Sequence, residues 1–418
     1  MAKTLVMVGA LDTKGREIDY VRERVSRHGV GTLVIDFGIM GEPQFKPDIR
    51  RQDVMAAADA DLRRLSSGEH KDEAMAAAAR GLEIVVRRLY DEGRLHGIFG
   101  MGGSAATSIA TAAMRCLPVG VPKLILSTMG GTDMSAFVGT RDITVMPSVV
   151  DVSGLNRVSR RIYANAAAAI AGMVAEEPPE VDVDRPLIVA SMFGNTTRAV
   201  DHARSILEHN GFEVLVFHAN GAGGRTMEGL IADHVVTASL DMTTTELADE
   251  VCGAMLSAGP DRCMAASRAS IPAVLVPGCV DMANFLGPET VPERYRGRNL
   301  YHWNINVTVM RTNAEENRRI GEMLAAAANA ATAPVTVLLP LRGVSMLDAE
   351  GLQFWDPEAD EACFETLRAK VKPGIAVIEA DYNINDPQFA ELAALTLLKM
   401  LAAGGDVNAG GVTDGDIP

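Results

Sequence analysis

A glycine-rich turn followed by a serine is the stretch of this sequence best suited to binding an anion. Apolar residues from Gly97 run into Gly100, Gly102 and Gly103, and Ser104 then opens an alanine-rich apolar run. This pattern predicts a buried strand, a tight turn and a helix with Ser104 as its N-cap. Glycines let the backbone approach a ligand closely, and free amides at a helix start attract anions. The alternative is a strand-to-helix turn without a ligand, and the motif alone does not separate the two.

Polar residues also follow the other strands predicted in the first half of the chain. Asp12 and Lys14 come after the apolar run 5–8, Asp36 comes after 32–35, and Thr128 and Gly131 come after 123–126. Ligands of parallel sheets bind beyond the carboxyl ends of the strands, so we expect these residues near the glycine turn. Lys14 could neutralise a phosphate, and Asp12, Asp36 or Asp133 could hold magnesium or ribose hydroxyls. Each residue alone is more often a cap or a surface charge, but together they favour a pocket for nucleotide phosphate and magnesium.

The second half carries its own polar residues after predicted strands. Arg225 follows the glycine run 221–224 and suits an anionic oxygen of a phosphate or carboxylate. Glu246 and Asp281 are the best candidates for general acid-base catalysis. The run Thr243–Glu246 also matches a capping box, so a structural role competes with catalysis at Glu246.

Other candidate residues lack a partner that spacing could assign. His218 ends a predicted strand and could titrate, although a packed and hydrogen-bonded histidine is as common there. Cys279 could act as a nucleophile, but no base can be paired with it. The residues 302–304 and Arg311 could form a lid over a cleft.

Familiar catalytic signatures are missing from the sequence. It has no G-x-x-x-x-G-K-[ST] motif and is therefore not a P-loop protein. Residues 100–105 satisfy G-x-G-x-x-A, but they follow the third strand instead of the first, and no acidic residue ends the next strand, so a redox dinucleotide is only weakly indicated. Ser104 does not lie within G-x-S-x-G, which disfavours a serine hydrolase. The histidines show no paired ligand spacing, which argues against a structural zinc site.

Strands and helices are predicted to alternate along the whole chain. This order predicts right-handed crossovers and parallel sheets covered by helices on both faces. The acidic, proline-rich stretch 176–186 interrupts the pattern, which then restarts. A chain of 418 residues is also too long for one ordinary domain. We therefore predict an α/β protein with two domains that face a cleft, each built on a doubly wound, mostly parallel sheet. Residues 1–180 would bind a nucleotide, and residues 181–418 would bind a substrate or another anion.

The amino-acid composition limits which binding partners and which cellular compartment we expect for this protein. The 39 Lys and Arg residues against 54 Asp and Glu give a formal charge of −15, which argues against nucleic acid or an anionic membrane as the main partner. The five cysteines are scattered without C-x-x-C pairs, as expected for reduced thiols. No signal peptide precedes the first strand pattern, and no apolar run is long enough to span a bilayer. These features predict a cytoplasmic protein.

Several motifs occur in one order along essentially the whole chain. They are G-M-G-G-S-A-A-T-S, V-G-V-P-K-L-I-L-S-T-M, the run 142–156, S-M-F-G-N-T-T, F-H-A-N-G-A-G-G-R-T-M-E, L-D-M-T-T-T-E, A-G-P-D-R, I-N-V-T-V-M-R-T-N-A-E-E-N and D-P-E-A-D. Together they resemble the bacterial and plant family that includes the inhibitory N-terminal domain of the tomato mosaic virus resistance protein. The resemblance implies two Rossmann-like subdomains, a dimer, and ATP with magnesium, which the plant member binds.

The resemblance also places the nucleotide site on this sequence. The residues concerned are Gly100, Gly102, Gly103, Ser104 and Thr107, with Thr128 and Gly131 as less direct matches. The chain departs from the expected pattern at Gly130–Gly131, where an alanine-serine-glycine loop is expected, and at Ala105–Ala106, where further glycine is expected. Both departures leave backbone amides available but narrow the space for a phosphate.

Three functional hypotheses follow. In the first, the chain is an ATP-dependent enzyme, such as a phosphotransferase or ligase, with Arg225 holding a small anionic metabolite and Glu246 or Asp281 as base. In the second, ATP stabilises a homodimer or higher homo-oligomer without turnover, and the protein is a regulatory module. In the third, the second sheet carries a nucleotide-independent isomerase, lyase or hydrolase activity on a sugar acid or keto acid.

Overall fold

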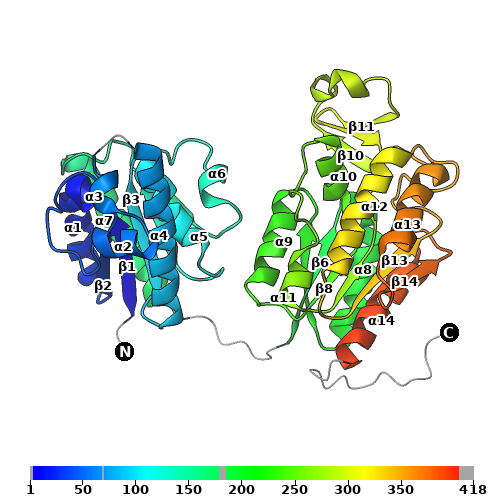
Figure 1. The fold of residues 1–418 in the computed structure, drawn as a ribbon, viewed down its shortest axis with the longest axis horizontal. Coiled ribbons are helices and arrows are strands. Elements are labelled where there is room, and N and C mark those ends of the chain that lie inside the picture. The colour runs from blue at the N-terminus through cyan, green and yellow to red at the C-terminus, as the bar shows by residue number, and fades with distance from the viewer. Residues whose placement is uncertain (1–2, 68–69, 178–184, 404–418) are drawn as a thin grey trace. The chain divides into compact units, whose positions relative to one another are not determined.

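The computed structural model describes residues 3–67, 70–177 and 185–403. The chain divides into two compact units, Met1–Glu180 and Val181–Pro418 (Figure 1). The acidic, proline-rich stretch 176–186 lies largely outside the described residues. Each unit is built around its own parallel sheet, as the alternation of strands and helices predicts.

The N-terminal unit contains a five-stranded parallel sheet in the order β2-β1-β3-β4-β5. Its strands are β1 (Thr4–Gly9), β2 (Gly31–Asp36), β3 (Gly97–Gly102), β4 (Lys123–Ser127) and β5 (Thr144–Pro147). The central strands are apolar on both faces because helices cover both sides of the sheet.

Helices form an outer layer on each face of this sheet. One face carries α2 (Arg51–Ala57), α3 (Leu62–Leu65), α4 (Lys71–Asp91) and α5 (Ser104–Arg115). The other face carries α1 (Leu11–Ser26) and α7 (Arg157–Ala175). The short α6 (Ser135–Val138) lies between β4 and β5. Successive strand residues alternate between the two layers: Val6 packs with α4 and α5, and Met7 packs with α1 and α7.

The C-terminal unit contains a six-stranded parallel sheet in the order β14-β13-β9-β8-β6-β7. Its strands are β6 (Leu187–Met192), β7 (Glu213–His218), β8 (Ala238–Asp241), β9 (Ala273–Leu275), β13 (Val335–Pro340) and β14 (Ala376–Ala380). One face is covered by α8 (Thr197–His209) and α14 (Pro387–Ala403). The other is covered by α9 (Ala222–Ala232), α10 (Thr245–Cys252), α11 (Ala265–Ala269), α12 (Ala314–Asn329) and α13 (Pro357–Lys370). Three short 3-10 helices connect other segments: η1 (Gly194–Thr196), η2 (Pro288–Thr290) and η3 (Glu293–Tyr295).

A small antiparallel sheet completes the C-terminal unit. Its strands are β10 (Met282–Phe285), β12 (Val307–Arg311) and β11 (Leu300–Asn304), in that order. The sequence suggests residues 302–304 and Arg311 as a possible lid over a cleft. Instead, residues 302–304 belong to β11, while Arg311 is buried and forms an ion pair with Asp360.

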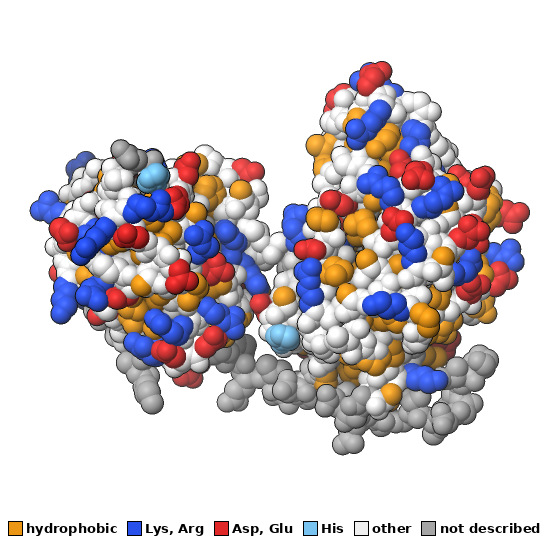
Figure 2. Space-filling model, in the orientation of Figure 1, with side chains coloured by type: hydrophobic (Ala, Val, Ile, Leu, Met, Phe, Trp, Pro, Cys, Tyr) orange, Lys and Arg blue, Asp and Glu red, His pale blue; other side chains and the backbone are white. Residues whose placement is uncertain are grey.

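The structure confirms the predicted α/β fold class with two Rossmann-like parallel sheets. Within the described ranges, no helix is both long enough and apolar enough to cross a bilayer. Figure 2 shows acidic and basic side chains mixed over the visible face, with hydrophobic side chains scattered among them.

Candidate functional site

The N-terminal sheet has a pocket at its topological switch point. From β1 the chain adds β2 on one side and then β3 on the other, so the strand order reverses between β1 and β3. A pocket of about 550 Å³ lies beside the carboxyl ends of these strands. Its walls come from residues after β1 and β2, from α3 and α4, and from the start of α5.

The start of α5 lines this pocket with backbone amides. The helix begins at Ser104, and the N-cap is Gly103, so the prediction of Ser104 as N-cap is wrong by one residue. No side chain caps the helix, and in the described part of the chain the amides of residues 104–106 have no hydrogen-bond acceptor. The first intrahelical bond runs from the Thr107 amide to the Gly103 carbonyl. The helix therefore presents unsatisfied donors where an anion could bind.

The glycines before α5 have different roles. A Cβ at Gly100 would lie 2.8 Å from the Ala110 Cβ, so this glycine lets α5 pack closely on β3. Gly102 has a φ of 151° and also faces Ala106, so it makes the turn. At Gly103 the nearest atom to an added Cβ is the Thr128 hydroxyl, at 3.8 Å. Of the three glycines, only Gly103 lines the pocket.

Three other residues predicted at this site lie outside the pocket lining. The Thr107 hydroxyl is buried and lies 2.7 Å from the Ser127 hydroxyl and 2.8 Å from the Gly103 carbonyl. Thr128 and Gly131 are exposed beyond the end of β4. Thr107 thus joins α5 to β4 within the unit.

Asp12 and Lys14 line the pocket together with Gly103. This agrees with the expectation that residues following parallel strands lie near the glycine turn. Asp12 Oδ2 accepts hydrogen bonds from the Met40 and Gly41 amides, each at 3.0 Å, and so fixes the loop after β2. Its Oδ1 is buried without a hydrogen-bond partner. Lys14 and Lys71 line the same pocket and form no ion pair with an acid in the described ranges. Lys71 was not predicted, because it opens α4 and is far along the chain from the end of any strand.

Asp36 does not line the pocket but connects two segments that do. Its Oδ1 accepts hydrogen bonds from the amides of Leu11 at 3.0 Å and Gly38 at 2.8 Å, which joins the start of α1 to the end of β2. Burial raises the pKa of Asp36, although these amide bonds act in the opposite direction. Neither Asp36 nor Asp133 lines the pocket. The exposed Asp133 accepts a hydrogen bond from the Ser135 amide, which lowers its pKa.

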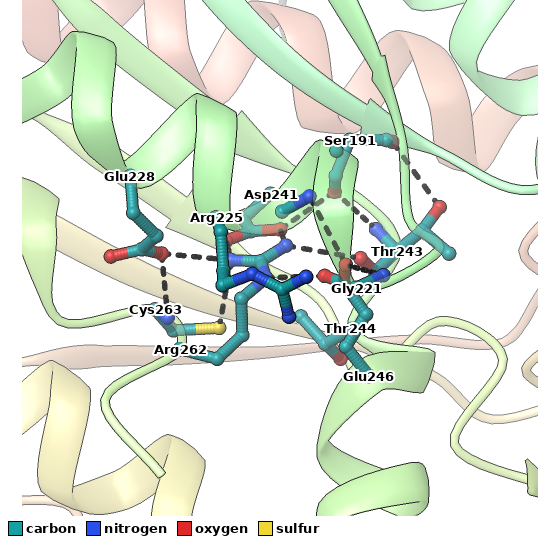
Figure 3. Close-up of polar contacts among 12 residues, drawn as sticks. Ser191, Gly221, Arg225, Glu228, Asp241, Thr243, Thr244, Glu246, Arg262 and Cys263 are labelled. Atoms are coloured by element: carbon teal, nitrogen blue, oxygen red, sulfur yellow. Dashed lines mark hydrogen bonds and ion pairs between the residues drawn. The ribbon is translucent and has the colours of Figure 1, made fainter. Parts of the chain in front are cut away.

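The equivalent position of the C-terminal sheet is filled by its own side chains (Figure 3). Its strand order reverses between β6 and β8. There the Ser191 hydroxyl donates to Asp241 Oδ1 at 2.6 Å, and Arg262 binds both oxygens of Asp241 at 2.5 and 2.7 Å. Arg262 Nε also binds Glu246 Oε2 at 2.6 Å, and its Nη1 binds Glu228 at 3.1 Å. The Arg262 side chain is fully buried, so three carboxylates hold its charge inside the unit.

Glu246 occupies the glycine turn at the start of α9. Its Oε1 accepts hydrogen bonds from the amides of Gly221 at 2.6 Å and Gly224 at 3.1 Å. A Cβ on Gly224 would overlap this carboxylate, which explains the glycine. The turn does bind an anionic oxygen, but that oxygen belongs to the protein. Glu246 is fully buried with both oxygens engaged, which leaves it poorly placed to act as a general base.

The capping box predicted at residues 243–246 is wrong. Thr244 is the N-cap of α10 and makes no side-chain capping bond. The Thr243 hydroxyl instead lies 2.7 Å from the Thr196 hydroxyl. Glu246 points toward the start of α9 because the turn there and Arg262 offer stronger partners than a neighbouring amide.

Asp281 lies in a second buried cluster of the same unit. Its Oδ2 accepts a hydrogen bond from the Ser345 hydroxyl at 2.7 Å, and its Oδ1 has no partner. Burial raises the pKa of Asp281, and the nearby Asp348 adds to the rise. Arg311 binds Asp360 at 2.6 Å and lies 3.8 Å from Asp348. This cluster is closed to solvent at Asp281, which is fully buried.

His218 and Cys279, the two remaining candidates, lie in environments that do not favour catalysis. The His218 ring stacks on Phe193 with 5.1 Å between ring centroids. Burial raises the pKa of the Cys279 thiol far above its usual value, which is unfavourable for a nucleophile. All five cysteines are free thiols. No group of three or more His, Cys, Asp or Glu side chains in the described ranges could hold a metal ion.

Known proteins similar to this chain identify its family. Residues 3–179 match the N-terminal domain, and residues 185–401 the C-terminal domain, of the family described as uncharacterised protein family UPF0261. The chain belongs to the UPF0261 family. A UPF0261 protein of Clostridium tetani is 45% identical over 96% of this chain and 100% of its own length. The tomato protein described as ToMV resistance protein Tm-1(GCR237) is 34% identical over 94% of this chain and 55% of its own length. These matches confirm the resemblance noted in the sequence.

Two solved structures show weaker likeness to this UPF0261 chain. A UDP-N-acetylglucosamine 2-epimerase is 10% identical with a TM-score of 0.22, covering 66% of this chain and 79% of its own. MurG of Acinetobacter baumannii is 11% identical with a TM-score of 0.23, covering 96% and 100%. Scores this low are uninformative about the site.

Proposed function

We propose that the N-terminal unit binds ATP with magnesium, with the phosphates held at the start of α5. The observation that carries this proposal is the row of unsatisfied amides at residues 104–106, which lines a pocket at the switch point of the sheet. In the C-terminal unit the corresponding amides at Gly221 and Gly224 are satisfied by Glu246. A helix start that keeps its donors free is suited to a phosphate ligand.

The charge of the pocket also fits a polyphosphate. Lys14 and Lys71 line it without an acidic partner in the described ranges, so both ammonium groups are available to phosphate oxygens. Asp12 Oδ1 is an unpaired carboxylate oxygen and would be a magnesium ligand or a ribose hydroxyl acceptor. Bound ATP with magnesium would supply a transferable phosphoryl group.

The rest of the pocket is apolar. Its lining includes Phe37, Ile39, Leu65, Met75 and Ile109. An aromatic base can pack against such side chains while the charged end of the nucleotide faces α5. The pocket volume of about 550 Å³ lies within the range of small-molecule sites.

Phosphoryl transfer to a small anionic metabolite is the enzymatic form of this proposal. A dimer or higher oligomer that binds ATP without turnover is the regulatory form, and assays of ADP release over a library of carboxylates and phosphate esters distinguish the two. If the protein does not bind ATP, the alternative is an isomerase, lyase or hydrolase that acts on a sugar acid or keto acid without a nucleotide.

Calorimetric titration of ATP and magnesium tests the site. Gly103 tolerates a side chain sterically, so Gly103→Val should fold and place methyl groups over the free amides. Gly172 is an exposed glycine of α7 outside the pocket lining with open space for a Cβ, which makes Gly172→Val a matched control. We expect Gly103→Val to weaken binding about tenfold or more, equal to about 1.4 kcal/mol, and Gly172→Val to leave it unchanged. Equal affinity in all three proteins would reject the site.

A further inference from the structure

The C-terminal unit has a pocket of its own between α9 and α11. Its volume is about 370 Å³. Small residues of both helices and the preceding loop provide the room: Gly229, Ala232, Ala258, Ala265 and Ala269. Arg262 also lines the pocket and binds Asp241 at the carboxyl end of β8. The pocket therefore lies beside the side chains that fill the switch point of the second sheet.

Arg225 provides this pocket with an unpaired positive charge. Its Nη1 donates a hydrogen bond to the Ser257 carbonyl at 2.8 Å, and it forms no ion pair with an acid in the described part of the unit. The exposed guanidinium keeps its Nε and Nη2 donors for another acceptor. Figure 3 shows Arg225 and Arg262 together, and the two differ in that Arg262 has three carboxylate partners.

The acids around the pocket already have partners. Glu228 accepts hydrogen bonds from the amides of Cys263 and Ala265, both at 2.7 Å, and from Arg262. Asp261 pairs with Arg268 at 3.0 Å. Figure 2 shows Lys and Arg side chains along the α9 edge of this unit. Of the three arginines that line the pocket, Arg262 and Arg268 have acidic partners, and Arg225 forms no ion pair within the described ranges.

We propose that the α9–α11 pocket binds a small organic anion, with Arg225 holding its single carboxylate or phosphate group. The planar guanidinium presents paired donors that match the oxygens of either group. The alanines leave room for a short aliphatic body beside this charge. This site lies wholly within the C-terminal unit and does not depend on nucleotide binding at α5.

Protection of Arg225 from phenylglyoxal tests this proposal in the full-length chain. Labelling of individual arginines is quantified by peptide mass spectrometry with sodium butyrate, with ethyl phosphate, or with chloride at equal ionic strength. At twice its dissociation constant, a bound anion lowers the free fraction of the site, and hence labelling, about threefold. Arg198 is the internal control because it is exposed, forms no ion pair in the described ranges, and lies on α8 at the opposite face of the sheet. Protection by butyrate or by ethyl phosphate identifies which anionic group the pocket prefers.

Two variants decide the outcome. Ala232→Leu fills the pocket from an exposed position of α9 and leaves Arg225 in place, so we expect it to abolish protection while unliganded labelling is retained. Gly103→Val should leave protection unchanged, which separates this site from the proposed nucleotide site. The proposal is overturned if neither anion protects Arg225 more than Arg198, or if Ala232→Leu is protected as well as the wild type.

Discussion

The Oε1 atom of Glu246 lies 2.6 Å from the amide nitrogen of Gly221. This contact joins the start of α10 to the glycine turn that opens α9, and Arg262 holds the other oxygen of the same carboxylate. The second glycine turn of the protein is therefore occupied by an internal anion. The first turn, at Gly103, has free amides and borders a pocket. The two glycine-rich turns are similar in sequence but differ in whether their backbone amides are already hydrogen-bonded.

Glu246→Gln should destabilise the C-terminal unit. The substitution replaces the charged acceptor of the Gly221 and Gly224 amides and of the fully buried Arg262 by a neutral one, and a hydrogen bond to a charged group contributes about 1.5–3 kcal/mol. Urea denaturation followed by circular dichroism measures the loss. Glu208→Gln is the control because it breaks an exposed pair with Arg204 on α8, which should cost less than about 1 kcal/mol. If Glu246→Gln were as stable as this control, the carboxylate would not be a structural element.

Asp249→Asn should remove a pH dependence from stability. Burial raises the pKa of Asp249 to about 7 in the folded protein, so between pH 4 and pH 7 the folded state binds more protons than the unfolded state. The stability that protonated Asp249 contributes is complete below its unfolded pKa and is lost as pH rises to about 7. The neutral variant keeps an acceptor for the amides of Leu256 and Asn284.

Denaturation at a series of pH values measures this effect. Relative to wild type, the free energy of unfolding of Asp249→Asn should rise by about 2–4 kcal/mol between pH 4 and pH 8. The exposed Asp201 of α8 provides the control variant Asp201→Asn, whose difference from wild type should stay nearly constant. Parallel pH curves for wild type and Asp249→Asn would contradict the prediction.

Thr107→Val should affect stability more than nucleotide affinity. The threonine hydroxyl lies against Ser127 and the Gly103 carbonyl and is absent from the pocket lining, so its loss removes an internal hydrogen bond worth about 1 kcal/mol. Thermal denaturation and ATP titration of the same variant measure the two effects. A large loss of affinity without a loss of stability would mean that Thr107 contacts the ligand directly, as the family resemblance implies.

Lys14→Ala and Lys71→Ala should each weaken ATP binding. Each change removes one unpaired ammonium group from the pocket, and a hydrogen bond to a charged group contributes about 1.5–3 kcal/mol. Calorimetry at two salt concentrations should show a weaker salt dependence in each variant, since one electrostatic contact is lost. Lys46→Ala, an exposed lysine of the same unit outside the pocket lining, should behave as wild type. Identical salt dependence in all four proteins would count against the lysines as phosphate contacts.

Much of the fold could be predicted from local patterns. Apolar runs that end in glycine or polar residues correspond to the strands of both parallel sheets. A strand buried on both faces must be apolar along its whole length, and turn residues mark where it ends, so both features can be read from the sequence. The small antiparallel sheet was missed, since β11 contains exposed aromatic residues and lacks the apolar run of a buried strand. At the candidate site, Asp12, Lys14 and Gly103 line one pocket, and their proximity could be expected because parallel strands end at a common edge.

The sequence by itself determined the two-sheet architecture and the strand ends that carry polar residues. Only the tertiary structure decided which of those ends is open to a ligand. Glu246 and Gly221 lie 25 positions apart, and Arg262 reaches Asp241 across 21 positions, so neither contact has a local signature. A buried carboxylate must accept hydrogen bonds from nearby donors, and the packing of the helices determines which donors are near it. The same physics leaves the amides at the start of α5 free, since no side chain of the described unit reaches them.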